Sequence, residues 1–507
     1  MLLTVPSEII DAIIENIDNP RDLAALSVVC KTLKERILPA SGEELGLLQC
    51  CYLSVSMDDI RVFDALAERP HLAGGIRKFH ISRHPPYHRY WRTGSEIVPP
   101  GVNVAPSTLR NALCSMRTLR FLSCDLLLTP TTDLSHVFKN LHRRCPDLAE
   151  VHLKLDATDP VEYQSDFGPP TLDGFSHLEA LELEVNEDAF TGLLPPAVED
   201  YVDRLGITLD RIASSLRHLS LAWYMDTADR LFDRFANLEL PALVSLSLAS
   251  YTRTTKKRSC DAMGTFLARH PRIQYLKIRG RLPVRIHPDT SPNLREMSIR
   301  FMGAARFNPL VSPLSSGNYR PLRRVELARH LPDLAAVLED ICSKRTAAIP
   351  SLKGLRLNEL NPVDGKFLRH LAGTRPDLEE LHCTLGGSQR SETEKIDALK
   401  KLLRIFPHLR SVQESGDVGW FIDDETLESE LPELGNLHPN LMCVNDWARQ
   451  DGNVWNHKGW KCFHIGNTHN LWNQDDDETS LWKWAVLAEV DCYGFAVPRS
   501  TLFRDEI

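Results

Sequence analysis

The sequence predicts a chain of the α/β class, built mainly as a solenoid in which outer helices cover a parallel inner sheet. Three observations support this prediction. A group of three apolar residues recurs along most of the chain, amphipathic stretches precede many of these groups, and a proline often stands between the two. A small helical segment precedes the repeats, and a tryptophan-rich segment follows them.

The first 33 residues predict two short amphipathic helices. Ser7 can cap the start of the first helix, which then carries apolar residues at helical spacing: Ile9, Ile10, Ile13, Ile14 and Ile17. Pro20 suits the first turn of the second helix, whose apolar stripe continues through Leu23, Leu26, Val29, Cys30 and Leu33. Because about 40 residues cannot bury this much apolar surface alone, we expect a partner.

The string from Pro6 to Leu33 resembles an F-box. In that family the module binds a Skp-type adaptor, which connects it to a cullin in a ubiquitin ligase. By position, the resemblance implies these adaptor-binding residues: Pro6, Glu8, Ile9, Ile13, Leu23, Leu26, Val29 and Cys30. Leu33 departs from the family, because many members have an aromatic residue there. The alternative interpretation is an ordinary helical hairpin that caps the next domain.

The repeated unit is an apolar residue, two variable residues, an apolar residue, one variable residue and a third apolar residue. From Leu119 to Leu441 it recurs with a mean spacing of about 29 residues. Its last two apolar residues lie two positions apart, which places both on one face of a strand. We therefore expect one parallel sheet whose strands are centred near residues 151, 181, 219, 246, 276, 297, 325, 355 and 381.

Amphipathic stretches before many of these strands predict helices. One example is the stripe formed by Ile396, Leu399, Leu403 and Phe406. A proline two residues before the first apolar position ends the helix and favours extended backbone after it. Eight units have this proline: Pro146, Pro241, Pro271, Pro292, Pro350, Pro376, Pro407 and Pro439.

This order of helix, proline and short strand resembles leucine-rich repeats, and the resemblance implies a horseshoe-like solenoid. Leucine-rich repeats carry an Asn or Cys three residues after the third apolar position. The better units of this chain have it only as Asn186, so the turn after each strand must satisfy its backbone groups in another way. The alternative is an irregular α/β domain whose strands share the pattern.

These patterns predict three domains. Residues 1–45 form the F-box-like module, residues 46–414 form the leucine-rich-repeat-like solenoid, and residues 415–507 hold degenerate last repeats and an irregular cap. Seven of the nine tryptophans lie in this last domain. Because an end repeat cannot bury its outer face on a neighbour, an aromatic cap is the preferred explanation, and a binding cleft rimmed by tryptophan is the alternative.

Composition indicates a globular protein, with 43% hydrophobic residues and a formal net charge of -9. The first residues lack a basic leader and no apolar run approaches about 20 residues, so we expect a cytoplasmic or nuclear protein without membrane contact. No group of residues predicts catalysis, and we expect neither enzyme activity nor a cofactor. The densest metal-capable group matches no zinc pattern, so we expect no metal at His457, Cys462, His464 and His469.

Charge is unevenly distributed along the chain. Residues 251–300 hold twelve Lys or Arg against three Asp or Glu, whereas residues 411–440 hold eight acidic residues and no Lys or Arg. On the repeat model, variable strand positions project to the concave side, which predicts one target-binding stripe formed by Tyr275, Lys277, Arg279, Arg300, Arg324 and Arg356. Arginine suits an acidic or phosphorylated segment of a target protein. Nucleic acid ranks lower because stacking aromatic residues are sparse there, and scattered solvated charge is the alternative.

The two resemblances together imply the substrate-recognition subunit of a cullin-type ubiquitin ligase. In that role the first module docks the adaptor and the repeats hold a target protein, whose identity the sequence does not give. The rival interpretation is a repeat-based protein-binding scaffold with no link to a ligase.

Overall fold

The computed structural model of the 507-residue chain divides into two compact units. Unit 1 comprises residues 1–216 and 460–507, and unit 2 comprises residues 217–459. With short gaps inside several ranges, the structure describes residues 52–82, 106–128, 138–157, 172–185, 195–223, 231–250, 264–280, 292–301, 322–328, 352–358, 365–383, 391–414, 422–449 and 455–457, together with Ile10, Val29, Cys30 and Leu33.

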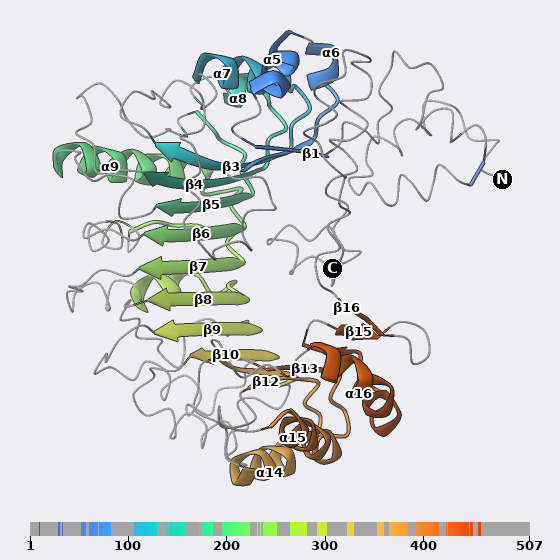
Figure 1. The fold of residues 1–507 in the computed structure, drawn as a ribbon. Coiled ribbons are helices and arrows are strands. Elements are labelled where there is room, and N and C mark those ends of the chain that lie inside the picture. Colours follow the sequence, from blue (N-terminus) through green and yellow to red (C-terminus); the bar gives the residue numbers. More distant parts are fainter. Residues whose placement is uncertain are drawn as a thin grey trace. The chain divides into compact units, whose positions relative to one another are not determined.

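Within its described residues, unit 1 contains parallel strands that pair in chain order (Figure 1). These strands are β1 (Tyr52–Ser56), β2 (Lys78–Ser82), β3 (Phe121–Leu128), β4 (Glu150–Ala157) and β5 (Ala180–Val185). The helices are α5 (Ile60–Glu68), α6 (Pro70–Ala73), α7 (Pro106–Ser115), α8 (Leu141–Arg144) and α9 (Pro195–Ile212). Phe63 of α5 packs edge to face on Phe79 of β2, with ring centroids 6.1 Å apart, so helix and strand share one core.

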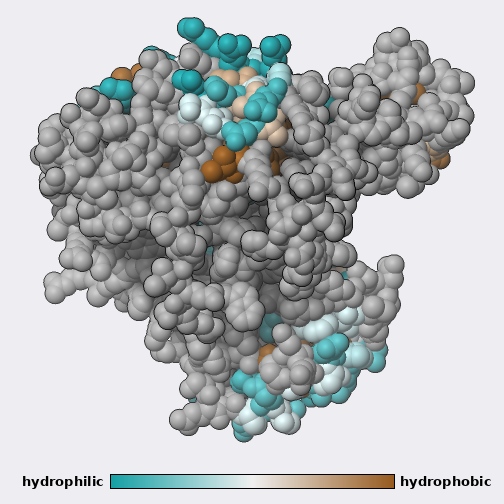
Figure 2. Space-filling model, turned by 45° about the horizontal axis from the view of Figure 1, so that its top comes forward, coloured by the Kyte–Doolittle hydropathy of each residue, from teal (hydrophilic) through white to brown (hydrophobic). Residues whose placement is uncertain are grey.

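The helices of unit 1 have one polar side. Asp64 and Glu68 of α5 are exposed, as are Arg110 and Asn111 of α7, whereas Leu66 and Leu109 on the same two helices are fully buried. The surface of the α5 to α8 region, which comes forward in Figure 2, is accordingly mostly hydrophilic. This division is typical of amphipathic helices that cover a sheet.

Unit 2 continues the same pattern, and its strands β6 to β14 pair in chain order and in parallel. They are β6 (His218–Trp223), β7 (Ser245–Ser250), β8 (Tyr275–Gly280), β9 (Glu296–Phe301), β10 (Arg324–Ala328), β11 (Gly354–Asn358), β12 (Glu380–Cys383), β13 (Ser411–Glu414) and β14 (Cys443–Val444). Three of the described helices are α14 (Gly365–Thr374), α15 (Glu392–Ile405) and α16 (Asp424–Leu437). A capping box between Ser391 and Glu394 begins α15.

The structure confirms the predicted parallel strands within each unit. The middle apolar residue of the repeat is at most 2% exposed in all nine predicted strands: Val151, Leu181, Leu219, Leu246, Leu276, Met297, Val325, Leu355 and Leu381. Burial alternates along β6, where each buried residue is followed or preceded by a partly exposed one. The predicted horseshoe, the F-box-like helices and the predicted boundaries at 45 and 414 stay predictions.

A backbone ladder connects the repeats at the turn before each strand. The residue after the first apolar position donates its N–H to the equivalent carbonyl of the preceding repeat, as from Gln274 to Val244 (2.8 Å) and from Lys353 to Arg323 (2.7 Å). The same type of bond recurs from Arg120 to Met442 within the described residues of each unit. Backbone groups that a folded chain must satisfy are therefore paired between repeats.

Buried polar side chains add a second set of links between repeats, at the residue directly before the proline that many units share. His270 accepts a hydrogen bond from Leu240 N–H (2.8 Å) at Nε2 and donates one from Nδ1 to Phe266 O (2.6 Å). His438 donates from Nε2 to Phe406 O (2.8 Å), and the Cys145 thiol donates to Met116 O (3.0 Å). These side chains hydrogen-bond the turn that precedes each strand. The expected Asn would instead lie in the turn that follows the strand.

Unit 2 changes its pairing after β14. Strands β15 (Trp447–Arg449) and β16 (Trp455–His457) are antiparallel to their neighbours. Arg449 donates from Nη1 to Pro439 O (2.9 Å) near the end of α16, and its guanidinium lies 6.0 Å from the Trp455 ring centroid. Trp447 is buried. Five further tryptophans of the predicted cap lie outside the described residues: Trp420, Trp460, Trp472, Trp482 and Trp484.

Candidate target-binding surface

The strands of unit 2 place their non-core residues on one face, which we call the polar face. Three rows cross β7 to β12 in register. The first row is Ser245, Tyr275, Glu296, Arg324, Gly354 and Glu380; the second is Ser247, Lys277, Ser298, Glu326, Arg356 and His382; the third begins with Ala249, Arg279 and Arg300. All six predicted target-binding residues therefore lie in these rows, with Arg300 placed by backbone register alone.

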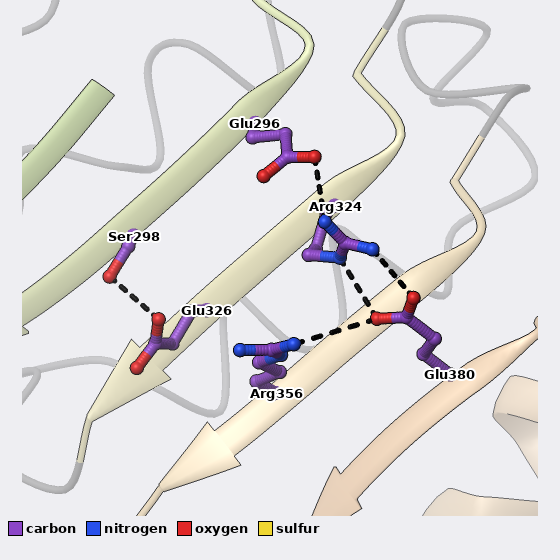
Figure 3. A network of polar contacts seen from close by, with 6 residues as sticks. All are labelled: Glu296, Ser298, Arg324, Glu326, Arg356 and Glu380. Atoms are coloured by element: carbon purple, nitrogen blue, oxygen red, sulfur yellow. Dashed lines mark hydrogen bonds and ion pairs between the residues drawn. The ribbon is translucent and has the colours of Figure 1, made fainter. Parts of the chain in front are cut away.

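Arg324 occupies the centre of a charge-paired network on this face (Figure 3). Its Nη1 donates to Glu296 Oε1 on β9 (2.7 Å), and its Nε donates to Glu380 Oε2 on β12 (2.9 Å). Its Nη2 also bonds Glu380 Oε1, so the contact with Glu380 is bidentate. Arg356 lies 3.8 Å from Glu380, and Ser298 donates to Glu326 (2.8 Å).

Gly354 makes the longer of these contacts possible. It lies on β11, between Arg324 on β10 and Glu380 on β12 in the same row. A Cβ at this position would lie 3.0 Å from Arg324 Cγ and 3.2 Å from Glu380 Oε2. The arginine side chain therefore crosses β11 where a Cβ would force it and Glu380 to move by a few tenths of an ångström.

The network shifts the pKa of its members. Burial alone would lower the pKa of Arg324, but the hydrogen bonds with Glu380 and the charge of Glu296 outweigh it and raise that pKa. Burial works to raise the pKa of Glu380, and the hydrogen bond and charge of Arg324 lower it overall. Burial, followed by the charge of Arg356, lowers the pKa of His382 to about 4, so this imidazole is neutral near pH 7.

The neighbouring stretch of the polar face has a different charge pattern. Lys277 faces Ser247 and Ser298 across the strands, and Arg279 faces Ala249 and Arg300. No carboxylate occupies these positions in the register. The Nε of Arg279 is buried without a hydrogen-bond partner.

Unit 1 also pairs charges across its strands. His152 on β4 lies 2.9 Å from Glu150 and 3.5 Å from Glu182 on β5, and Lys154 lies 3.4 Å from Glu184. None of these residues was predicted from the sequence, and neither were Glu296, Glu326, Glu380 and His382. The available signal was the recurrence of Glu directly before the second apolar position of a repeat, at Glu150, Glu296 and Glu380.

Two of the predicted adaptor-binding residues are described. Val29 is 58% exposed and lies in a turn, and Cys30 is partly exposed and lies outside any helix, so the predicted helix does not continue unbroken through these two residues. Ile10 and Leu33 of the same motif are buried. The other six lie outside the described residues: Pro6, Glu8, Ile9, Ile13, Leu23 and Leu26.

The described part of the chain contains no group of three His, Cys, Asp or Glu side chains arranged to hold a metal ion. None of its helices is long and apolar enough to cross a membrane. Of the metal-capable residues considered above, Cys462, His464 and His469 lie outside the described residues.

Comparison with known proteins finds similarity to solved structures but none to sequence families or curated proteins. No family model and no curated protein matches the sequence. Among solved structures, the chain is similar to the crystal structure of the Rad7 and Elc1 complex in yeast, with a TM-score of 0.37 and 12% sequence identity over 86% of this chain and 92% of that chain. This similarity is too low to carry a conclusion about function.

Proposed function

We propose that this chain is the substrate-recognition subunit of a cullin-type ubiquitin ligase. The observation that carries the proposal is the F-box-like string from Pro6 to Leu33, which stands directly before a long array of repeats. Val29, one of the residues assigned to the adaptor, is 58% exposed, as an apolar docking residue must be before its partner binds.

The repeats hold the target protein in this proposal. Their parallel strands present a broad polar face with Lys, Arg and Glu side chains in register, and such a face suits recognition of a charged protein segment. The chain then contributes proximity between the target and the ubiquitin-loading enzyme and needs no catalytic group of its own.

Capture of a Skp-type adaptor by the full-length chain tests the proposal. We expect wild-type protein to retain the adaptor and Val29→Lys to reduce its capture about tenfold or more, because the lysine charge would be buried against the adaptor. Ile207→Lys is the matched control, since Ile207 is an exposed apolar residue (44%) on α9 outside the motif. Ile13→Lys and Leu26→Asp should also abolish capture.

Two outcomes of this capture experiment would contradict the proposal. Equal capture by Val29→Lys and wild type would place the adaptor contact elsewhere. No capture by wild-type protein would favour the rival function, a repeat-based scaffold without a ligase.

A further inference from the structure

Strands β6 to β9 of unit 2 run in the same direction and begin along one edge of the sheet (Figure 1). The backbone ladder joins their starting turns, for example from Gln274 N–H to Val244 O (2.8 Å) and from Arg295 N–H to Gln274 O (2.7 Å). Three steps of about 4.8 Å between strands give this edge a length of about 14 Å. We call six exposed or partly exposed side chains at these turns the turn edge: Arg217, Glu239, Arg269, Arg272, Gln274 and Arg295.

The arginines of the turn edge have no acidic partner among the described residues. Arg217, Arg269 and Arg272 are exposed. Arg295 is partly exposed, and none of the four forms an ion pair with a described residue. Arg272 donates from Nη1 to the carbonyl of Pro241 at 3.5 Å, which lays its side chain along the edge without neutralising its charge.

The carboxylates near the turn edge do not cancel this charge. Glu296 on β9 bonds Arg324 of the polar face (2.7 Å). Glu239 of the turn edge forms no ion pair among the described residues. At the equivalent ladder position of β11, by contrast, Lys353 lies 2.9 Å from Glu379. Four arginines against one glutamate therefore leave the turn edge positively charged.

An extended acidic segment matches the turn edge in length and spacing. At about 3.3 Å per residue, about four or five residues cover the edge, and alternate side chains of such a segment lie about 7 Å apart on one side. Guanidinium groups bind carboxylate or phosphate oxygens with paired hydrogen bonds. A nucleic acid is a poorer match, because the described residues of the turns before β7, β8 and β9 include no Phe, Tyr or Trp on which bases could stack.

We propose that the turn edge binds an acidic or phosphorylated segment of a partner protein. The segment runs across the starts of β6 to β9 and places its oxyanion groups on Arg217, Arg272 and Arg295, while Arg269 adds positive charge beside them. Arg323 continues the ladder on β10 but has interactions within the chain, so we do not assign it to the site. That the partner is a ubiquitination target rests on the proposed function; the binding site itself does not.

Peptide binding to the full-length chain tests the site. The probes are a Glu-rich peptide, the same peptide with two phosphoserines in place of Glu, and a neutral Gln version. We expect both anionic peptides to bind, more weakly as the salt concentration rises, and the Gln version not to bind. The double variant R272Q/R295Q should bind the anionic peptides at least tenfold more weakly, with an unchanged melting temperature.

The matched control is R404Q/R410Q, which removes the same charge from exposed residues of unit 2. Arg410 is the ladder residue of β13, so it has the same place in its repeat as Arg295, but its neighbour on the ladder is Glu379. The control should change the affinity less than twofold. An equal loss in both double variants would show that only net charge matters and would overturn the proposal. A larger fall of the melting temperature in R272Q/R295Q than in the control would show that these arginines serve the fold, and would also overturn it.

The remaining outcomes separate the site from the proposed function. Wild-type protein that binds neither anionic peptide would overturn the site, as would equal binding by R272Q/R295Q and wild type. Tighter binding of single-stranded or duplex DNA than of either peptide would overturn a protein partner. Adaptor capture by R272Q/R295Q should equal that of wild type. Wild-type protein that binds the peptides but captures no adaptor would contradict the ligase function and support the site alone.

Discussion

Strands β8 and β10 carry arginines on the same face of one sheet, yet the two arginines have different surroundings. Arg324 on β10 bonds carboxylates on β9 and β12, whereas Arg279 on β8 lies opposite an alanine and another arginine. The residue type and the strand face are the same in both cases. The register of the neighbouring strands therefore decides whether an arginine on this face bonds carboxylates of the sheet.

Removal of Arg324 should have the largest effect on stability. Arg324→Leu leaves Glu296 and Glu380, both about a quarter exposed, without their shared cation. We expect the free energy of unfolding to fall by about 2 to 4 kcal/mol, less than for a fully buried pair because solvent screens part of the interaction. Urea unfolding of the full-length chain measures this change.

Arg279→Leu provides the comparison for that measurement. Because no ion pair of Arg279 is lost among the described residues, we expect a change below about 0.5 kcal/mol. If both variants lose the same stability, the distinction between the ion-paired Arg324 and Arg279, which forms no ion pair among the described residues, is wrong.

Acid should destabilise the charge-paired network through His382. The folded protein holds the pKa of this buried imidazole at about 4, below its usual 6.5, so the unfolded chain binds the proton first as the pH falls. Stability that is present above pH 6.5 is therefore lost toward pH 4, by about 2 kcal/mol between pH 7 and pH 5. His382→Gln should remove most of this slope when unfolding is measured at both pH values.

Other groups limit the pH range of that experiment. The pKa of His382 also depends on the charges of its neighbours Arg356, Glu380, Glu326 and Arg324. Because the pKa of Glu380 is lowered in the folded protein, its protonation adds a further loss of stability below about pH 4.5. Burial also lowers the pKa of His270, which leaves a residual slope in the variant. An unchanged slope in His382→Gln would show that His382 does not titrate below its usual pKa.

The strand positions could be predicted from the sequence because apolar spacing is a local signal. Residues such as Leu181 and Leu355 must face the core whatever lies on the neighbouring strand, and both are almost fully buried. The links at the turn before the strand were missed, since His270 and His438 look like ordinary core histidines until the position of the previous repeat is known.

The charge pairs could be predicted only in part. The sequence places Arg324 and Arg356 on the polar face, and the structure agrees. Their partners come from residues 24 to 56 positions away, and the contact between Arg324 and Glu380 skips a whole strand. Such a contact requires a small residue on the intervening strand, here Gly354 on β11. A local sequence pattern does not show which residue of a distant repeat will lie at that position.

Filling the space above β11 at Gly354 should have the smallest effect on the free energy of unfolding. Gly354→Ala adds a Cβ 3.0 Å from Arg324 Cγ and 3.2 Å from Glu380 Oε2, so the two side chains must move apart by a few tenths of an ångström. We expect a loss of about 1 kcal/mol, which the better strand propensity of alanine partly offsets.

Gly373→Ala is the matched control, because a Cβ there meets nothing within 4 Å and the residue lies in α14. Alanine is the better helix former, so this variant should be neutral or more stable by up to about 1 kcal/mol. Opposite signs for the two substitutions would show that space over β11 holds the network together. In the double variant Gly354→Ala with Arg324→Leu, the cost of the alanine should disappear, because leucine makes no bond to Glu380 that the new methyl group could disturb. A full additive cost in that double variant would mean that Gly354 serves the backbone of β11 and not the reach of Arg324.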